Sequence, residues 1–163
     1  MASLGLFEGE RVELLYGLIV RMPPKGPPHE SGIERLSELL LPRLIGRAKV
    51  RIQLSFAASD GSQPEPDVAL VPMGDYRKDH PKTAHLLIEV ADSSLEVDRG
   101  EKAQLYAECG VPEYWIVNLR DDLVEVHSDI VNGVYRRVQP YRRGDRLRIA
   151  AFPDVEIAVD AIL

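Results

Sequence analysis

The chain has 163 residues, a formal net charge of −6 at pH 7 and a sequence pI near 5.3. With 45% hydrophobic and 28% charged residues, the composition excludes a disordered chain and predicts a single domain, residues 1–163, that is long enough to bury a core. The acidic balance argues against a general nucleic-acid coat, because neutralising phosphates normally requires a basic face.

The N-terminal part of the chain predicts a hairpin followed by a helix. Residues 11–15 and 18–22 are apolar runs around a short turn, a pattern typical of two antiparallel strands. After a proline-rich stretch, apolar side chains at helical spacing predict a helix over residues 29–44. Pro42 should end or kink this helix.

The middle of the chain predicts four strands and a second helix. Residues 49–56 alternate between apolar and polar side chains, which is the period of a half-buried strand. Residues 67–72, 86–90 and 113–119 are short runs rich in leucine and β-branched residues, and they predict buried central strands. A helix over about residues 98–108 precedes the last of them. The order is therefore helix, three strands, helix and strand, in a mixed α/β (α+β) domain.

The C-terminal segment predicts further strands. Residues 122–149 alternate in polarity, with turn signals at Asn132-Gly133 and Gly144-Asp145. We expect a β-meander that extends the central sheet.

Two carboxylates and one ammonium stand out on these elements. Asp67 and Glu89 each lie where an apolar strand meets an acidic group, and Lys102 follows on the second helix. An ionised carboxylate in a buried strand is costly unless a cation or a hydrogen-bond partner offsets its desolvation. Two carboxylates and an ammonium are also the groups that a metal-dependent phosphodiesterase uses.

Each of these residues also has a structural explanation. Asp67 follows Pro66, and Pro-Asp is a common turn pair. Glu89 could form a structural salt bridge with a nearby base, and Lys102 could be one of the exposed lysines that are common on helices. The pairing of the two acids favours a site over these alternatives.

The runs PDVALV, LLIEVADSS and EKAQLYAECGVPEYWIVNL, together with VELLYGLIV near the N-terminus, are similar to the putative restriction endonuclease family. This is a bacterial branch of the PD-(D/E)XK nuclease superfamily, and the resemblance covers most of the chain. It implies a restriction-endonuclease-like core. The superfamily motif places a lysine two residues after the second acid, where this chain has Ala91, and the resemblance implies that Lys102 replaces it from the following helix.

The resemblance also implies a mechanism. Asp67, Glu89 and the main-chain carbonyl of Val90 would hold Mg²⁺, with Mn²⁺ as an alternative. Lys102 would position or deprotonate the attacking water, or neutralise charge on the phosphate. Glu30, near the start of the first helix, corresponds to an acid that some superfamily members use as an auxiliary metal ligand.

Other polar and aromatic residues are expected to be structural. His29 lies on the apolar stripe of the first helix, which favours a packed, hydrogen-bonded histidine over a metal ligand. Tyr106 and Trp115 could stack on bases, but their apolar neighbours favour the core. Glu13 matches a family position, and a hydrogen bond across the hairpin explains it equally well.

The basic residues fall into two groups along the chain. Either group could form a local basic surface, although solvated faces of a helix and of hairpin strands are favoured. The first group lies within residues 35–51 and the second within residues 136–148.

The sequence also favours a cytoplasmic protein. A single cysteine, Cys109, excludes an internal disulfide and fits a reducing compartment. The segment MASLGLFEGE does not resemble a signal peptide, and no apolar run reaches the roughly 18 residues of a membrane span.

Two functions remain open. The first is a Mg²⁺-dependent DNA endonuclease, expected to be a homodimer because cutting both strands of a duplex requires two active sites. The second is a nuclease-fold module that no longer cuts and serves in binding or regulation. The retention of both acids and of Lys102 favours the first.

Overall fold

The centre of the computed structural model is a six-stranded sheet in the order β3-β4-β5-β6-β7-β8. The structure describes residues 9–163, so most of the MASLGLFEGE segment lies outside the described residues. Neighbouring strands are antiparallel except for β5 and β6, which are parallel. The strands are β3 (Lys49–Ile52), β4 (Val68–Val71), β5 (Leu86–Ala91), β6 (Tyr114–Asn118), β7 (Leu123–Val131) and β8 (Val134–Arg142).

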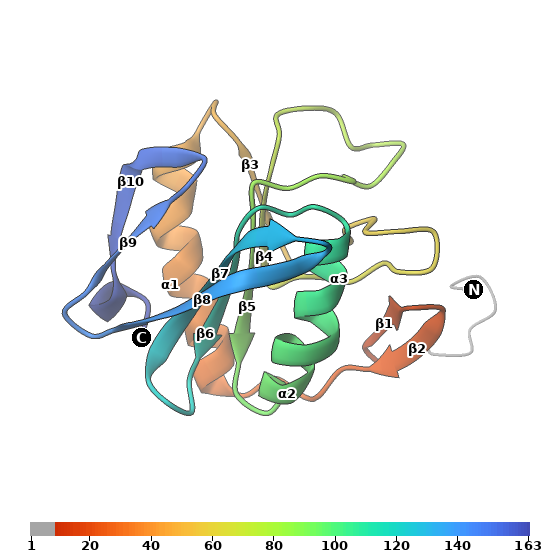
Figure 1. Ribbon diagram of the computed structural model, residues 1–163, viewed down its shortest axis with the longest axis horizontal. Coiled ribbons are helices and arrows are strands. Elements are labelled where there is room, and N and C mark those ends of the chain that lie inside the picture. Colours follow the sequence, from red (N-terminus) through yellow and green to blue (C-terminus); the bar gives the residue numbers. More distant parts are fainter. Residues whose placement is uncertain (1–8) are drawn as a thin grey trace.

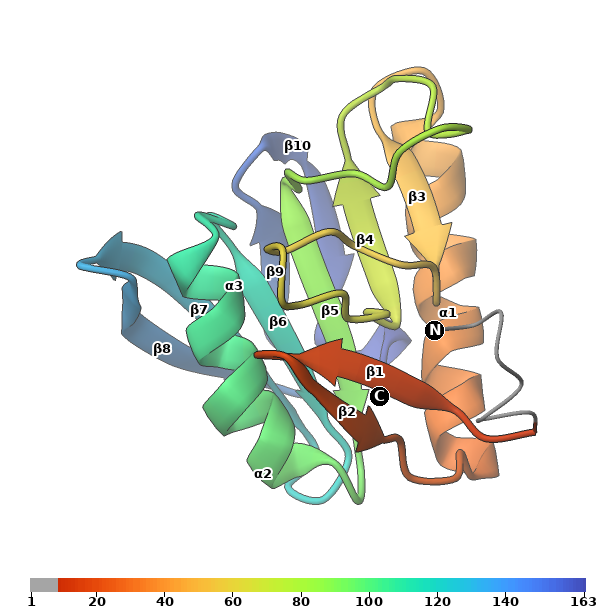
Figure 2. The same ribbon diagram turned by 90° about the vertical axis from the view of Figure 1, so that its right-hand side faces the viewer.

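Helices cover both faces of this sheet. Helix α1 (Pro27–Leu44) lies on one face, and the consecutive elements α2 (Leu95–Val97), η2 (Asp98–Lys102) and α3 (Ala103–Glu108) lie on the other (Figures 1 and 2). Element η2 is a π-helical turn, a rare conformation that is frequent at functional sites. The three consecutive elements form the crossover that two parallel neighbours such as β5 and β6 require. The predicted order of helix, three strands, helix and strand is therefore confirmed.

Alternation along β5 assigns its side chains to the two faces. Leu86, Ile88 and Val90 join the core beneath α1, whereas Leu87 and Ala91 join the core beneath α3. Glu89 shares the parity of the second set. Its carboxylate is therefore directed toward the face that carries α3.

The predicted meander is correct for β7 and β8 but wrong beyond them. Strand β9 (Arg146–Ile149) does not extend the sheet; it pairs with β10 (Phe152–Ala158) in a separate two-stranded sheet, followed by the short 3₁₀ turn η3 (Val159–Ala161). The alternation of this hairpin buries Leu147 and Ile149 in the core beneath α1. The hairpin thus covers a face of the central sheet. Packing its apolar side against that core removes more apolar surface from water than pairing at a sheet edge would.

Two other predicted boundaries differ from the structure. The strand expected over residues 49–56 ends at Ile52, because Gln53 adopts a φ of 53°, which an extended strand does not allow. Helix α1 continues past Pro42 to Leu44, so this proline does not end the helix. Pro42 cannot donate the hydrogen bond to the Glu38 carbonyl, but only Arg43 and Leu44 follow it in the helix.

The N-terminal hairpin is confirmed as β1 (Val12–Leu15) and β2 (Leu18–Arg21). Both turn residues, Tyr16 and Gly17, have positive φ, as a two-residue type I′ turn requires. Leu15 is buried in the core on the α3 side, which fixes the hairpin over that face. Among the described helices, none is both long and apolar enough to cross a membrane.

Candidate active site

Asp67 lies directly before β4, and its carboxylate is held on both oxygens. Oδ2 accepts a hydrogen bond from the backbone N–H of Val90 at 2.8 Å and lies 3.1 Å from His29 Nε2. Oδ1 accepts a hydrogen bond from the Gln53 side chain at 3.1 Å. The positive φ of Gln53, which ends β3, thus coincides with a contact to the site.

Glu89 and Lys102 form the second half of the cluster. Lys102 Nζ lies 3.0 Å from Glu89 Oε1, and the Tyr106 hydroxyl donates to the same oxygen at 2.8 Å. The two halves adjoin, because the Asp67 N–H donates a long hydrogen bond of 3.4 Å to Glu89 Oε2. A lysine on the helix that follows β5 therefore does reach the carboxylate on β5.

Glu13 and Asp98 complete the contacts of Lys102. Its ammonium lies 3.2 Å from the carboxylate of Glu13 and 3.7 Å from Asp98. Glu13 also accepts a hydrogen bond from the backbone N–H of Glu65 at 2.9 Å. Neither Glu13 nor Asp98 was among the predicted site residues, although Asp98 and Lys102 are four residues apart and so share a helix face.

His29 also belongs to the site through its contact with Asp67. It lies at the start of α1, which approaches β5 closely: a Cβ at Gly32 would lie 3.0 Å from Val90 Cγ1. Glycine at this position lets the helix pack against the strand that also holds Asp67 through the Val90 N–H. The prediction of a hydrogen-bonded histidine fits this arrangement, but its partner is a candidate site residue.

Burial and charge together set the protonation of the cluster. Burial raises the pKa of Glu89 well above its ordinary value, against the opposing charge of Lys102 and with the repulsion of nearby carboxylates. Burial likewise raises the pKa of Asp98 to about 6. Burial alone would lower the pKa of Lys102, but Glu89, Glu13 and Asp98 outweigh it and raise that pKa. Lys102 is therefore a cation at neutral pH.

Asp67 behaves differently from the other acids. Burial favours its neutral form, yet the hydrogen bond and charge of His29 and the Val90 N–H lower its pKa below the ordinary value. Asp67 is therefore ionised at neutral pH.

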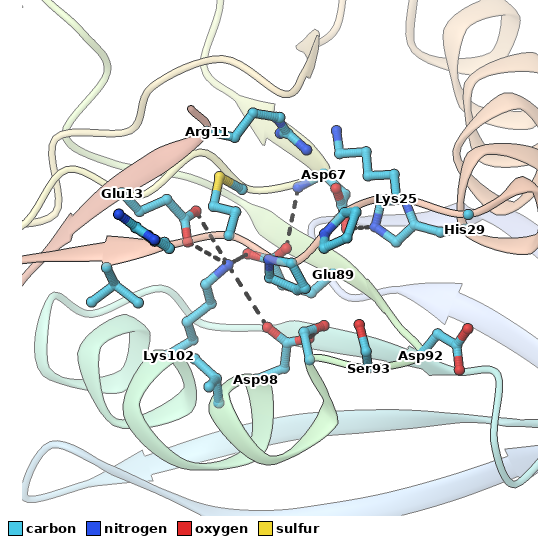
Figure 3. A pocket seen from close by; sticks show the side chains of 18 residues that line it. Arg11, Glu13, Lys25, His29, Asp67, Glu89, Asp92, Ser93, Asp98 and Lys102 are labelled. Carbon is cyan, nitrogen blue, oxygen red and sulfur yellow. Dashed lines mark hydrogen bonds and ion pairs between the residues drawn. The ribbon is translucent and has the colours of Figure 1, made fainter. Parts of the chain in front are cut away.

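A cavity of about 360 Å³ opens onto this cluster (Figure 3). Its walls come from the N-terminal hairpin, the proline-rich segment that follows it, and the segment 92–98 after β5. Asp67, Glu89 and Lys102 line it, each no more than 5% exposed. A small anionic group that entered the cavity would meet all three.

The structure thus brings together three of the predicted site residues, with Val90 beside them through its N–H. Glu30 is exposed and is not among the residues that line the cavity. Trp115 and Tyr106 are fully buried core residues, as predicted, and Tyr106 also bonds to Glu89. Within residues 9–163, no three His, Cys, Asp or Glu side chains are already arranged around a point that could hold a metal ion.

A family model described as "Uma2: Putative restriction endonuclease" matches residues 3–160 of the chain. No curated protein matches the chain. Among solved structures, the fold is similar to the crystal structure of a putative nuclease belonging to DUF820 from Anabaena variabilis, with a TM-score of 0.69 over 94% of this chain and 89% of that one. The two sequences are 12% identical, so this likeness shows the fold alone.

Proposed function

Because the chain belongs to the Uma2 family of putative restriction endonucleases, we propose that it is a metal-dependent endonuclease that hydrolyses phosphodiester bonds in DNA. The observation that carries the proposal is the contact of Lys102 with Glu89 at 3.0 Å, in a cavity that Asp67 also lines. A salt bridge with a purely structural role would require neither a second buried acid beside it nor a cavity.

The chemistry of the donors fits a hard divalent cation. Three buried carboxylates, those of Glu13, Glu89 and Asp98, lie within 3.7 Å of a single ammonium, and the buried Asp67 adjoins Glu89. Burial raises the pKa of Glu89 and of Asp98, and repulsion from the neighbouring carboxylates adds to the rise, so a bound cation would favour their ionised forms.

Asp67 and Glu89 are the residues that would hold Mg²⁺ or Mn²⁺. The Val90 carbonyl would be a further ligand, since the N–H and C=O of one strand residue point to the same side and this N–H is directed at Asp67. When bound, such an ion supplies positive charge that polarises a phosphate and lowers the pKa of water. Cluster side chains must shift to admit it, as Glu89 Oε1 is now occupied by Lys102 and Tyr106.

Lys102 acts as a cation in this proposal. Its raised pKa favours donation of hydrogen bonds to a phosphate oxygen over removal of a proton from water. Glu13 and Asp98 would keep the ammonium in the cavity if Glu89 held a metal ion. Lys102 thereby offsets charge that develops on the phosphate.

His29 and Gln53 position Asp67. Their contacts at 3.1 Å fix the orientation of its carboxylate before any ligand enters. Cleavage of both strands of a duplex would further require a homodimer, which supplies a second active site.

The proposal is tested by cleavage assays on supercoiled, linear, single-stranded and branched DNA with Mg²⁺ and with Mn²⁺. Wild type should cleave at least one form, EDTA should stop the reaction, and Asp67→Ala and Glu89→Ala should abolish it. Asp154→Ala is the matched control, since that carboxylate is exposed and pairs with Arg47 on the surface. If wild type shows no cleavage beyond the two site variants, the nuclease is rejected in favour of a module that only binds.

A further inference from the structure

The wall of the cavity carries cations that the proposed chemistry does not use. Arg11, Arg21 and Lys25 all line it, together with the buried acids. In Figure 3, Arg11 and Lys25 lie on one side of Asp67 and Glu89, and Lys102 lies on the other. The acids are therefore flanked by positive charge on two sides.

Arg11 and Lys25 differ from Arg21 in their partners. Arg21 is paired with Glu10 at 3.2 Å. Among the residues that the structure describes, no carboxylate lies within ion-pair distance of Arg11 or Lys25. Both are thus available to a ligand at the entrance, Arg11 as an exposed and Lys25 as a partly buried side chain.

Some of the other basic residues of the chain are paired with carboxylates on the surface. Within the two groups noted in the sequence, Arg47 pairs with Asp154 and Arg143 with Asp122, each at 2.7 Å. Arg146 and Arg148 share Glu156. These pairs reduce the free positive charge of both groups, whereas Arg11 and Lys25 lie at the cavity itself.

The backbone holds Arg11 and Lys25 near each other. Lys25 lies in the segment PPKGPP, whose prolines fix φ on both sides of it. The carbonyl of Arg11 accepts a hydrogen bond from the N–H of Met22 at 2.9 Å, which ties the start of the hairpin to the start of that segment. The two charges are therefore presented by restrained backbone, which reduces the entropy lost on binding.

We propose that Arg11 and Lys25 form a phosphate clamp that binds the DNA backbone at the entrance to the cavity, an inference that rests on the proposed function. The buried carboxylates and the net charge of −6 repel DNA, so a nuclease of this composition needs local cations beside its site. Partial burial, and then the nearby Arg11, lower the pKa of Lys25, a repulsion that an anion between the two would relieve.

The test is DNA binding measured without cleavage. Fluorescence anisotropy with labelled single-stranded and duplex oligonucleotides in EDTA would compare wild type with Arg11→Gln, Lys25→Gln and the double variant. Each single change should weaken binding about 5- to 10-fold. The slope of log K against log salt should become shallower by about 0.9 per lost contact on duplex and about 0.7 on single strands.

Arg136→Gln is the matched control. It removes the same charge from an exposed side chain on β8 that does not line the cavity. Its affinity and salt slope should remain within about twofold of wild type. Absence of DNA binding by wild type, an unchanged affinity and slope in the double variant, or an equal loss in Arg136→Gln would overturn the clamp.

Cleavage assays separate this inference from the proposed function. Binding that depends on Arg11 and Lys25 in a protein that never cleaves DNA would uphold the clamp and reject the nuclease. Cleavage that requires Asp67 but proceeds normally in the double variant, with normal binding, would reject the clamp alone.

Discussion

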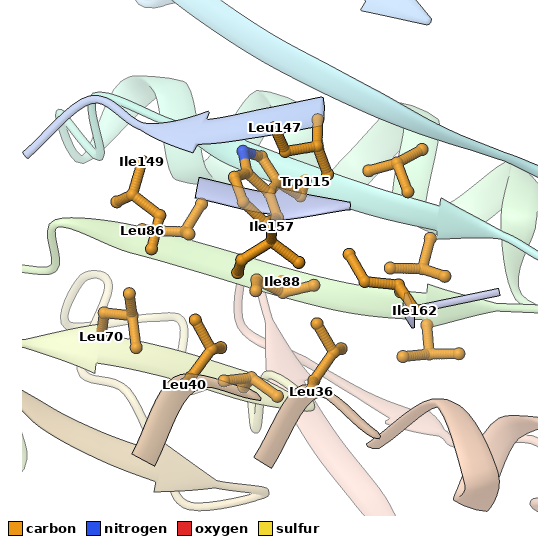
Figure 4. Close-up of a cluster of buried hydrophobic side chains, with 14 of the residues drawn as sticks. Leu36, Leu40, Leu70, Leu86, Ile88, Trp115, Leu147, Ile149, Ile157 and Ile162 are labelled. Atoms are coloured by element: carbon orange, nitrogen blue, oxygen red, sulfur yellow. The ribbon is translucent and has the colours of Figure 1, made fainter. Parts of the chain in front are cut away.

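Buried carboxylates occur on both faces of the central sheet, and their surroundings differ. On the face beneath α1, Glu113 lies beside an otherwise apolar core (Figure 4) and accepts hydrogen bonds from the Trp115 indole at 2.6 Å and from the Ala150 N–H at 2.9 Å. On the face beneath α3, Glu89 lies among three other acids, a lysine and a cavity. Burial raises the pKa of both.

The difference shows that a buried acid alone does not identify a site. Glu113 has two neutral donors and, among residues 9–163, no charged group is in contact with it, so it has a sufficient structural explanation. The acids around Lys102 outnumber the cations that face them, and such an excess is costly unless a ligand relieves it.

The largest effect is expected for Glu89→Gln compared with Glu113→Gln in cleavage. Glu89→Gln should reduce the rate by roughly 100- to 1000-fold or more, because it removes a carboxylate oxygen from the metal-holding pair. Glu113→Gln should leave the rate within about threefold of wild type. Single-turnover assays with saturating Mg²⁺ would measure both, and a comparable loss in the two variants would remove the distinction between the faces.

The next largest effect concerns Lys102→Met. This change leaves the buried acids without their cation and should lower the free energy of unfolding by about 3–5 kcal/mol at pH 8 without metal. The loss should be smaller at pH 5, because the raised pKa values keep Glu89 and Asp98 largely protonated there. Urea denaturation at the two pH values measures it, and an equal loss at both would show that packing, not charge, is the cause.

Asp98→Asn should instead increase the free energy of unfolding. The pKa of Asp98 is raised from 3.8 to about 6, so the folded state holds its proton more tightly than the unfolded state does. Stability from this group is fully present below pH 4 and is lost as pH rises through about 6. Removing the charge should therefore raise the free energy of unfolding of the metal-free protein at pH 7.5 by about 1–3 kcal/mol.

Comparison of the two stability curves checks that prediction. The difference between Asp98→Asn and wild type should develop mainly between pH 4 and pH 6. The lowered pKa of Asp67 changes stability in the opposite direction: its contribution is lost as pH falls, but only below the ordinary pKa of an aspartate. A variant less stable than wild type at every pH would show that the contact of Asp98 with Lys102 outweighs the cost of burying the Asp98 charge.

The smallest effect is expected for Gly32→Ala. The added methyl group would lie 3.0 Å from Val90 Cγ1, so α1 or the valine must shift by a few tenths of an ångström. We expect a loss of about 1–2 kcal/mol in stability and a reduced cleavage rate, because the same shift moves His29 relative to Asp67. Gly100→Ala, where an added methyl group meets no heavy atom within 4 Å, is the control in both assays.

The sequence predicted those site residues whose burial is energetically costly in their own segment of the chain. Asp67 and Glu89 are recognisable because an acid in an apolar strand is expensive, and Lys102 because of a family resemblance. Glu13 and Asp98 were not predicted as members, since their role depends on where the hairpin and the π-helical turn pack. The same limit applies to β9, whose alternation fixes a buried side but not the surface that covers it.

Metal-dependent stabilisation tests the central claim most directly. The melting temperature of wild type, Glu89→Gln and Glu113→Gln would be followed against Mn²⁺ and Mg²⁺ concentration at pH 8, because a ligand that binds only the folded state raises it. Wild type and Glu113→Gln should be stabilised to the same extent, and Glu89→Gln should respond little. An equal response in all three proteins, or none in wild type, would contradict a metal site at Asp67 and Glu89.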